Sequence, residues 1–399
     1  MSYRFNRAQI RFLSSDQAAD IHREYREQAE KYADSLRIQT ALRAQYSDLP
    51  SDIIAACMAQ FALQWRGAAK CNLPDNALYT EAALEMASSA ATAALHAALL
   101  GNVFPHPPRI LEIAAGIGSD SVALARNAGT LVCIEADPVH TLMLRHNLAA
   151  AHAPNTCVLR GKAEDVLPAL RLEGIDAVFA DPARRNAGRR YVNVEQYAPP
   201  LSIFDAFSPD LPLLVKIGPA ATAPEGWQVA TVAADGECKE ILLHRNLGLP
   251  AICALDAESG ERWTAPTSPP LPVSVGNPVW LIEAHGAIIR TGQLASYFRE
   301  QHCEAIDPHI AYAWSETRPE DSRWHQCFHI LRIEPYNRKG LQRGIDALDF
   351  GPGSEIKKRG FPETTDSIRA RLHFRGRRNG VVILTRQADA HLMIFAKRP

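Results

Sequence analysis

The stretch Arg109–Asp120, RILEIAAGIGSD, decides the fold of this chain. Its first residues are mostly apolar and predict a short buried strand. Gly116 and Gly118 predict a sharp turn after that strand, because glycine lets the backbone bend tightly and lets a ligand approach closely. The residues from Asp120 to Asn127 then predict a helix. A strand that passes through a glycine turn into a helix is typical of α/β sheets that bind nucleotide-like ligands, although the same turn also occurs without a ligand.

Apolar runs continue this pattern along the chain. Further strands are predicted at 130–134, 156–159, 175–180 and 211–217, with a helix at 138–151. Nearly all-apolar strands that alternate with helices indicate a parallel sheet covered on both faces. Residues 229–233 and 237–244 predict a terminal hairpin around Asp235-Gly236.

The regions on either side of this sheet differ from it in pattern. Before it, helices are predicted at 15–45, 52–69 and 80–100, which together make a helical leader. After it, strands are predicted at 324–333, 349–356, 381–386 and 391–396, with a helix at 367–372.

The composition describes an ordinary globular chain with one uneven feature. The chain has 399 residues, of which 47% are hydrophobic and 22% charged. This length allows about two or three domains, and the composition excludes a disordered or fibrous chain. The net charge is −1, yet residues 331–399 contain 15 Lys+Arg against 7 Asp+Glu. That basic end predicts an anionic partner.

The cysteines and the apolar runs indicate where in the cell the protein is expected. The eight cysteines are scattered and form no CxxC pair, so neither a disulfide framework nor a zinc site is expected. No apolar run reaches the ~18 residues of a membrane span, and arginines stand where a signal peptide needs its apolar core. We therefore expect a cytoplasmic protein without a metal or a membrane partner.

Acidic residues follow three of the predicted strands or stand within them. Glu112 lies just before the glycine turn, where it suits a ligand with an ammonium group; Ser121 in place of a third glycine weakens a pyrophosphate site. Glu135 ends the second strand, where a carboxylate accepts hydrogen bonds from both hydroxyls of a ribose. Ala163-Glu164 follows the third strand, where an adenine edge would be bound. The alternatives are a solvated Glu135 and a helix N-terminus at 163–164 that favours acidic residues.

Asp181 ends the fourth strand, and a cluster of arginines follows it. Strand carboxyl ends are where such sheets bind ligands, and Pro182 biases Asp181 away from helix. The guanidinium groups that come next suit a phosphate, which they bind bidentately; they belong to Arg184, Arg185, Arg189 and Arg190. The alternative is an internal salt-bridge network with Glu195 and other acidic residues.

The basic C-terminal region contains Lys357, Lys358 and Arg359, with aromatic residues interleaved among its cations. This pattern favours nucleic acid, whose bases stack on aromatic rings. The alternative is a solvated surface above aromatic residues of the core. His309 is more simply a packed or capping histidine, and Cys238 a small buried apolar residue.

Taken together, the glycine turn, Glu135, Ala163-Glu164 and Asp181-Pro182 resemble the cofactor motifs of class I S-adenosylmethionine-dependent methyltransferases over roughly residues 107–245. Six motifs in order extend the resemblance to a bacterial methyltransferase family with a C-terminal THUMP-like domain. They are KCNLP at 70–74, SSAAT at 88–92, DPARR at 181–185, GECKE at 236–240, DPH at 307–309 and EIKKRG at 355–360.

This resemblance implies an α/β fold: a Rossmann-like class I methyltransferase sheet between a helical leader and an α+β THUMP-like module. The implied domains are a helical region at 1–106, a methyltransferase domain at 107–264, a ferredoxin-like linker domain at 265–317 and a THUMP-like RNA-binding domain at 318–399. The implied cofactor is S-adenosylmethionine, and the implied partner is structured RNA.

The resemblance also implies roles for single residues. The methionine moiety would lie at Glu112, Gly116 and Gly118, with Asp120 also in the cofactor set, the ribose at Glu135 and the adenine at Ala163 and Glu164. Asp181 would be the catalytic residue, facing the methyl sulfonium and the target base. The residues expected to bind the RNA are Arg184, Arg185, Arg189, Arg190, Lys357, Lys358 and Arg359.

Two departures from the family pattern limit what the resemblance implies. Ala114 stands where many methyltransferases have glycine, and it should be tolerated if its φ is negative. Asp-Pro-Ala-Arg lacks the aromatic residue of enzymes that methylate exocyclic amines, and it looks closer to enzymes that act on a ring carbon or ring nitrogen. A catalytic cysteine after 211–217 has no match, so the acceptor atom stays open. A small-molecule methyltransferase and a non-catalytic RNA-binding protein are the competing hypotheses.

Overall fold

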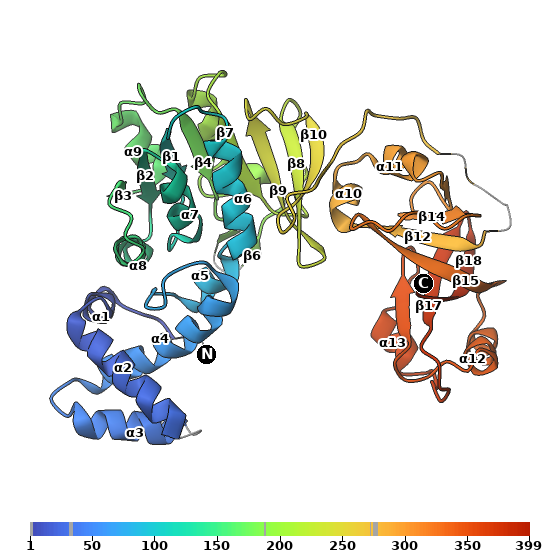
Figure 1. Cartoon of the computed structure of the whole chain (residues 1–399), viewed down its shortest axis with the longest axis horizontal. Coiled ribbons are helices and arrows are strands. Elements are labelled where there is room, and N and C mark those ends of the chain that lie inside the picture. The colour runs from blue at the N-terminus through green and yellow to red at the C-terminus, as the bar shows by residue number, and fades with distance from the viewer. Residues whose placement is uncertain (1–2, 32–34, 187–188, 272, 274–277) are drawn as a thin grey trace. The chain divides into compact units, whose positions relative to one another are not determined.

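The computed structural model describes residues 3–31, 35–186, 189–271, 273 and 278–399 (Figure 1). It divides into two compact units. The first contains Met1–Ala234, Lys239–Ile252 and Asp256–Glu261, and the second contains Asp235–Cys238, Cys253–Leu255 and Arg262–Pro399.

The leader is helical, as predicted, but it has more helices than the sequence pattern indicates. Its helices are α1 (Arg7–Leu13), α2 (Asp16–Lys31), α3 (Ser35–Gln45), α4 (Ser51–Lys70), α5 (Glu81–Met86) and α6 (Ala90–Gly101). The single helix predicted at 80–100 is wrong because Ser89 caps a new helix: its side chain accepts a hydrogen bond from the Thr92 N–H. The leader core also contains Ile117 and Met143 from the sheet domain.

The prediction of a parallel sheet is confirmed. The central strands are β1 (Arg109–Ile113), β2 (Thr130–Glu135), β3 (Thr156–Arg160), β4 (Ala177–Ala180) and β7 (Leu213–Ile217), all parallel to their neighbours among these five. They alternate with α7 (Ser119–Asn127), α8 (Pro138–Ala150) and the short α9 (Ala163–Val166).

A hairpin completes the sheet in the antiparallel sense. β8 (Gln228–Ala234) and β9 (Glu237–Arg245) flank Asp235 and Gly236, which have φ angles of 49° and 72°. Two successive residues with positive φ match the twist of a tight hairpin. With β10 (Ile252–Asp256) and β11 (Arg262–Trp263), nine described strands form one sheet in the order β11-β10-β8-β9-β7-β4-β1-β2-β3.

The second unit is built around a mixed sheet. Its described strands lie in the order β13-β14-β12-β15-β18-β17-β16. They are β12 (Trp280–Ala284), β13 (Glu304–Ala305), β14 (Tyr312–Ser315), β15 (His325–Pro335), β16 (Glu355–Lys358), β17 (Val381–Gln387) and β18 (Ala390–Lys397). The helices are α10 (Gly286–Arg290), α11 (Leu294–Glu300), α12 (Arg338–Ala347) and α13 (Thr365–Arg369).

Helix α12 was not predicted, and the strand predicted at 349–356 forms only at its end, as β16, which continues to Lys358. Two glycines lower the helix propensity of α12, and they are there for packing. A Cβ on Gly344 would lie 2.1 Å from the Phe395 ring, so only glycine lets α12 approach β18 this closely. Asn337 fixes the start of the helix by accepting a hydrogen bond from the Gly340 N–H.

The sheet of the second unit curls strongly. Glu283 on β12 accepts a hydrogen bond of 2.7 Å from Lys357 on β16, although three strands separate β12 from β16 in the sheet order. A flat sheet would hold those strands several times the ~4.8 Å strand spacing apart. The edge strand β16 and the inner strand β12 therefore approach each other.

No helix within the described ranges is both long enough and apolar enough to cross a membrane.

Candidate functional site

The site lies where the parallel strands β1, β2, β4 and β7 end. Parallel strands present their carboxyl ends at one edge of the sheet, and that edge is the usual ligand site of α/β folds. The glycine turn follows β1, Glu135 ends β2, Asp181 follows β4 and Lys216 is the fourth residue of β7. The fold therefore brings the predicted segments to one edge.

The glycine turn takes the backbone into the left-handed region. Gly116 has a φ of 60°, and a Cβ there would meet no atom within 4 Å, which leaves open space beside the backbone. Gly118 has a φ of 95°, and a Cβ there would lie 2.8 Å from a methyl carbon of Leu144. Glycine is thus needed at 118 for both conformation and packing.

The condition under which Ala114 would be tolerated without strain, a negative φ, is not met. Its φ is 60° because the chain bends into the left-handed region directly at the end of β1. A non-glycine residue in that region carries roughly 1–2 kcal/mol of strain from its Cβ. Residue 114 thus has the backbone conformation that glycine favours, although it is an alanine.

Glu135 contacts the glycine turn itself. One carboxylate oxygen accepts from the Gly116 N–H at 2.7 Å, and the other accepts from the Asp137 N–H at 2.7 Å. Burial raises the pKa of Glu135, although these two backbone donors offset part of that effect. Each oxygen retains a lone pair for a further donor. Its contact with a ribose stays a prediction.

The third predicted segment lies next to Glu135. The Gly161 N–H donates to the Glu135 carbonyl at 3.0 Å, which places the start of α9 beside the end of β2. Within α9, Ala163 is buried and Glu164 is exposed. The predicted adenine contacts therefore lie beside the predicted ribose contact.

Glu112 is a buried carboxyl on β1. Its side chain is 1% exposed and accepts a hydrogen bond from the Cys133 thiol, with 3.3 Å between sulfur and oxygen. Burial, together with the nearby Asp120 and Asp181 carboxylates, raises the pKa of Glu112 to about 8. A carboxyl in this setting gains from a nearby cation, which favours its ionised form.

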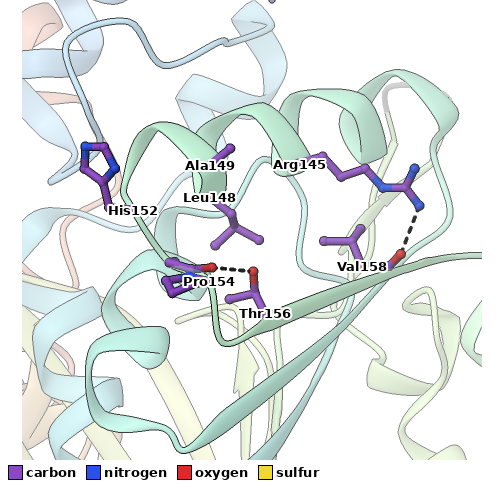
Figure 2. Close-up of a pocket in the computed structure, with 8 residues that line it drawn as sticks. Arg145, Leu148, Ala149, His152, Pro154, Thr156 and Val158 are labelled. Carbon is purple, nitrogen blue, oxygen red and sulfur yellow. Dashed lines mark hydrogen bonds between the residues drawn. The ribbon is translucent and has the colours of Figure 1, made fainter.

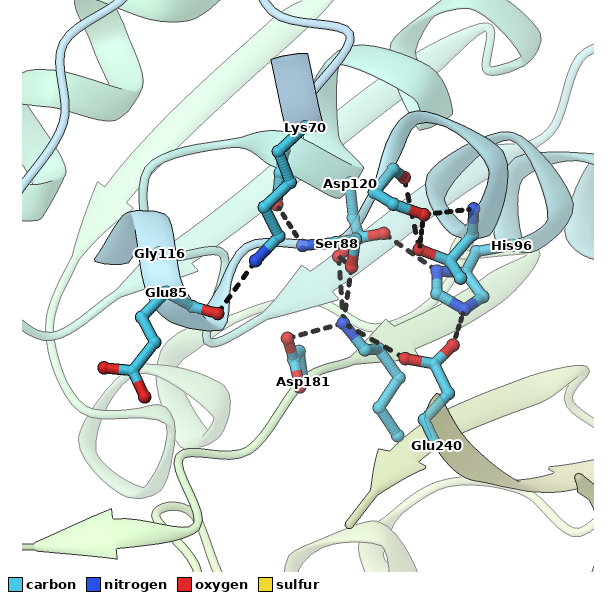
Figure 3. A network of polar contacts seen from close by, with 12 residues as sticks. Lys70, Glu85, Ser88, His96, Gly116, Asp120, Asp181 and Glu240 are labelled. Atoms are coloured by element: carbon cyan, nitrogen blue, oxygen red, sulfur yellow. Dashed lines mark hydrogen bonds and ion pairs between the residues drawn. The ribbon is translucent and has the colours of Figure 1, made fainter. Parts of the chain in front are cut away.

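A buried polar network joins the leader to the edge of the sheet (Figure 3). We call it the Lys216 network; its members are Ser88, His96, Asp120, Asp181, Lys216 and Glu240. The Lys216 ammonium donates to Ser88 at 2.6 Å, to Asp181 at 2.7 Å and to Asp120 at 3.3 Å. It also lies 3.8 Å from a Glu240 oxygen.

His96 fixes the other side of this network. Its Nδ1 lies 2.8 Å from an Asp120 oxygen, and its Nε2 lies 2.5 Å from a Glu240 oxygen. Burial alone would lower the pKa of His96, but the two carboxylates outweigh it and raise the pKa to about 9. His96 is therefore an imidazolium at neutral pH, with both ring nitrogens donating.

The charges of the network stabilise one another. Burial alone would lower the pKa of Lys216 and raise that of Asp120. The carboxylates instead raise the pKa of Lys216, while Lys216 and His96 hold the pKa of Asp120 well below its usual range. The same two cations lower the pKa of Glu240 against the effect of burial. Lysine, histidine and two of the carboxylates are thus all charged.

Asp181 is the member of the network that reaches solvent. Its side chain is 37% exposed, whereas the Lys216 side chain is 7% exposed. Burial of the carboxyl group raises the pKa of Asp181, and Lys216 offsets part of that rise. Lys216 holds Oδ2, and Oδ1 has no hydrogen-bond partner among the residues that the structure describes. One oxygen is therefore anchored, and the other is free to accept a hydrogen bond.

Among the predicted arginines, Arg184 lies at this edge. It is half-buried, and its Nη1 lies 2.8 Å from the place that a Cβ on Gly218, directly after β7, would take. Arg185 and Arg190 pair their backbones in a two-stranded ribbon of β5 (Arg185–Asn186) and β6 (Arg189–Arg190). The side chains of Arg185, Arg189 and Arg190 lie outside the described part of the structure.

The basic residues predicted to bind RNA in the second unit have partners within the protein. Lys357 and Arg359 both pair with Glu283, at 2.7 and 3.2 Å, and Lys358 donates to the Phe361 carbonyl at 3.1 Å. Phe361 is buried and packs edge-on against Tyr336. These aromatic residues therefore contribute to the core, and the binding of RNA by the three cations stays a prediction.

Sequence reasoning missed Lys216 and His96, and it gave no chemical role to Ser88 and Glu240. The signal for Lys216 was present: a single lysine stands in the otherwise apolar run LPLLVKI. A lysine in a strand that is buried on both faces needs a partner, because burying an unpaired charge is costly. His96 gave no signal, since one histidine in an alanine-rich helix has no distinctive spacing.

The described residues also form a hollow of about 730 Å³ on the outer side of α8 and β3, shown in Figure 2. Its lining includes Pro154 and Thr156 at the start of β3 and Ala149 at the end of α8. It therefore lies toward the amino ends of the strands, away from the edge that carries the Lys216 network. Within the described ranges, no three or more His, Cys, Asp or Glu side chains are arranged to hold a metal ion.

Comparisons with known proteins agree with this architecture. Residues 325–398 match the family model described as THUMP domain-like. An uncharacterised S-adenosylmethionine-dependent methyltransferase of Mycobacterium tuberculosis strain H37Rv is 29% identical over 342 residues, covering 81% of this chain and 89% of that protein. A tRNA/tmRNA (uracil-C(5))-methyltransferase of Cronobacter sakazakii is 31% identical over 104 residues, covering 23% of this chain and 28% of that protein.

A solved structure shares the fold over most of the chain. It is a protein of Porphyromonas gingivalis W83 that is provisionally named a methyltransferase. The two superpose with a TM-score of 0.71 at 20% sequence identity, covering 88% of this chain and 92% of that one. The chain is therefore similar to an S-adenosylmethionine-dependent methyltransferase over most of its length, shares the α/β fold of the Porphyromonas gingivalis protein, and ends in a region that matches the THUMP domain-like family model.

Proposed function

We propose that this chain transfers the methyl group of S-adenosylmethionine to a base of structured RNA, such as tRNA or rRNA. The observation that carries the proposal is the convergence of the glycine turn, Glu135 and Asp181 at one edge of the sheet, in a chain that ends in a THUMP-like domain. A relative that matches part of this chain is named for a tRNA substrate, which also supports RNA.

The cofactor residues follow from that edge. We assign the methionine moiety to the glycine turn, with Gly116 in the open backbone and Glu112 supplying negative charge for the ammonium group. The ribose is assigned to Glu135, and the adenine to Ala163 and Glu164 beside it. Asp120 begins the helix after the turn, and its carboxylate is held by Lys216 and His96. We therefore assign Asp120 to the support of the cofactor site.

Asp181 is assigned to the reaction itself. The sulfonium of S-adenosylmethionine is already activated, so the protein mainly supplies alignment of the methyl group and its acceptor. Because Lys216 holds Oδ2 of Asp181, we assign Oδ1 to accept a hydrogen bond from an N–H on the target base. If that hydrogen is on the acceptor atom, the carboxylate also removes the proton as the methyl group arrives.

The RNA is assigned to cations on both units. Arg184 lies at the edge of the sheet, close to Asp181 in sequence, and a guanidinium binds phosphate bidentately. Arg185, Arg189 and Arg190, and the C-terminal Lys357, Lys358 and Arg359, are proposed to contact the RNA backbone. Contacts to phosphate fix register, while the base at the methyl group determines what is modified. We place this activity in the cytoplasm, because all eight cysteines, each in the described part of the chain, are free thiols.

The proposal is tested with the purified full chain. S-adenosylhomocysteine should bind in calorimetry, and tritium from labelled S-adenosylmethionine should enter total bacterial RNA prepared from a strain that lacks the gene. Asp181→Asn should reduce the transfer rate about 10²- to 10⁴-fold and change the S-adenosylhomocysteine affinity less than about threefold. The exposed Asp205→Asn is the matched control and should behave as the parent chain.

Each negative result points to another function. No heat with millimolar S-adenosylhomocysteine would refute the enzyme and leave a non-catalytic RNA-binding protein. Cofactor binding without salt-sensitive RNA retention would refute the RNA substrate and favour a small-molecule methyltransferase, because phosphate contacts weaken as salt rises. Nucleoside mass spectrometry of RNA from cells with and without the gene then identifies the modified nucleotide.

A further inference from the structure

We propose that Lys216, together with Ser88 and His96 of the helical leader, positions the Asp181 carboxylate for methyl transfer, so that the leader is part of the catalytic centre. This inference rests on the proposed function of Asp181 and adds residues that no sequence motif had assigned to the reaction. It concerns positioning, since Lys216 is 6% exposed and acts through Asp181.

The Lys216 ammonium has its geometry fixed by its partners. An ammonium group carries three protons, and the three shortest contacts are to Ser88, Asp181 and Asp120, at 2.6, 2.7 and 3.3 Å. Each proton therefore has an acceptor, and the ammonium cannot turn without breaking a contact. Asp181 is held at one oxygen by a group that is itself held on two other sides.

The leader supplies Ser88, which contacts Lys216 directly, and His96, which holds two of the carboxylates around Lys216. The Ser88 hydroxyl accepts from Lys216 and donates to Asp120 at 2.7 Å. The Ser88 N–H donates to the Ser119 hydroxyl at 3.3 Å, which ties the segment before α6 to the first residue of α7. His96, which lies in the middle of α6, bridges Asp120 and Glu240.

The helices that precede Ser88 are also tied to one another. The Lys70 ammonium at the end of α4 donates to the carbonyl oxygens of Leu84 and Glu85, at 2.9 and 2.8 Å, near the end of α5. Figure 3 shows Lys70, Ser88 and Asp181 in one field around the network. Lys70 thereby ties the end of α4 to α5, which directly precedes Ser88, so the position of Ser88 is supported from within the leader.

Stability does not explain why so many charges are buried here. The desolvation of each buried ion costs several kcal/mol, and well-packed apolar side chains of similar volume are often as stabilising. A charged network that reaches solvent through one carboxylate is instead what a reaction site requires. Asp181 is that carboxylate, at 37% exposure.

The test removes the ammonium and supplies it again from solution. Lys216→Ala in the full chain should lower the single-turnover rate of tritium transfer into total bacterial RNA about 10²-fold, since a misplacement of about 1 Å at a reacting group costs that much. The affinity for S-adenosylhomocysteine should fall far less than the transfer rate, because His96 and Ser88 still hold the Asp120 carboxylate. Ethylamine at tens of millimolar should restore at least about a tenth of the lost rate, because it places an ammonium in the vacated space.

Ser88→Ala keeps every charge and tests the leader directly. It should lower the transfer rate about 5- to 20-fold with the chain still folded at the assay temperature, because it removes both hydrogen bonds by which the Ser88 hydroxyl joins Lys216 to Asp120. Arg66→Ala is the control: it breaks an exposed ion pair between leader helices, 2.7 Å from Glu81, outside the network.

The outcomes separate this inference from the proposed function. A parent chain that binds no S-adenosylhomocysteine, or that labels no RNA, refutes the proposed function before any variant is made. An active parent with a Ser88→Ala variant of unchanged rate refutes the role of the leader. A Lys216→Ala variant that loses cofactor binding and thermal stability together, without rescue by ethylamine, shows that Lys216 only maintains the fold.

Discussion

Glu112→Gln should make the ligand-free protein more stable. The Glu112 side chain is 1% exposed, and burial raises its pKa to about 8 from an ordinary value of 4.5. At pH 7 the unfolded chain therefore holds this carboxylate ionised, while the folded chain keeps it mostly protonated. The difference of about 2.5 pH units corresponds to about 3 kcal/mol of lost stability.

The sign of the pH dependence follows from the raised pKa. A carboxyl with a raised folded-state pKa costs nothing below pH 4.5, and its cost grows as pH rises through about 8. Urea unfolding at pH 5, 7 and 8.5 should show the advantage of Glu112→Gln growing from less than about 1 kcal/mol to more than about 3 kcal/mol. The exposed Glu173→Gln is the control, with no growing advantage expected. Parallel pH profiles for Glu112→Gln and the parent would refute the reasoning.

The same substitution should weaken the binding of the cofactor. The ammonium of S-adenosylhomocysteine favours the ionised form of Glu112, so binding near pH 7 should release a proton. Calorimetry in two buffers of different ionisation enthalpy should show that release in the parent and not in Glu112→Gln. Equal heats in both buffers for the parent would show that the ammonium lies away from Glu112.

Three further predictions concern other parts of the molecule. Ala114→Gly should raise the free energy of unfolding by about 0.5–1 kcal/mol in urea titration, because relief of left-handed strain exceeds the added entropy of the unfolded chain; a loss of stability would contradict that strain. His96→Gln should be less stable than the parent by about 3 kcal/mol below pH 6.5, and this difference should fade as pH rises through about 9. The reason is that His96, whose pKa is raised, stabilises the fold only while its ring is protonated. A difference that does not fade with pH would contradict this role of His96. Gly344→Ala should destabilise the second unit by about 1–3 kcal/mol in thermal unfolding, because its Cβ would clash with Phe395, and a neutral result would mean that α12 moves freely on β18.

The sequence predicted the sheet well because apolar strands carry their own signal. The strands predicted at 130–134 and 211–217 correspond to β2 and β7, and the turn at Asp235-Gly236 was identified from its residue types. Helices were harder to predict where glycine serves packing, as at Gly344 in α12. The break before α6 depended on a single cap at Ser89, which looks like any other serine in an alanine-rich run.

The positions of the candidate site residues were predicted from the sequence, but the hydrogen bonds and ion pairs that connect them were not. Glu135, Gly116 and Asp181 were found because they stand at strand ends, where position alone is informative. The Lys216 network depends on contacts between residues more than 100 positions apart, such as Ser88 and Lys216. No local sequence pattern predicts such a contact. The positive φ of Ala114 could not be predicted either, because it depends on the conformation of the whole turn.

The leader core has a consequence for how the chain matures on the ribosome. Helices α1 to α4 are synthesised before α7 and α8, yet the hydrophobic cluster that buries Ile10, Leu42 and Ile54 also contains Ile117 and Met143. The N-terminal helices must therefore wait, with part of their apolar surface uncovered, until α8 has been synthesised. During that interval the nascent chain is a natural client for chaperones, and a pause in translation before residue 143 would lengthen its exposure.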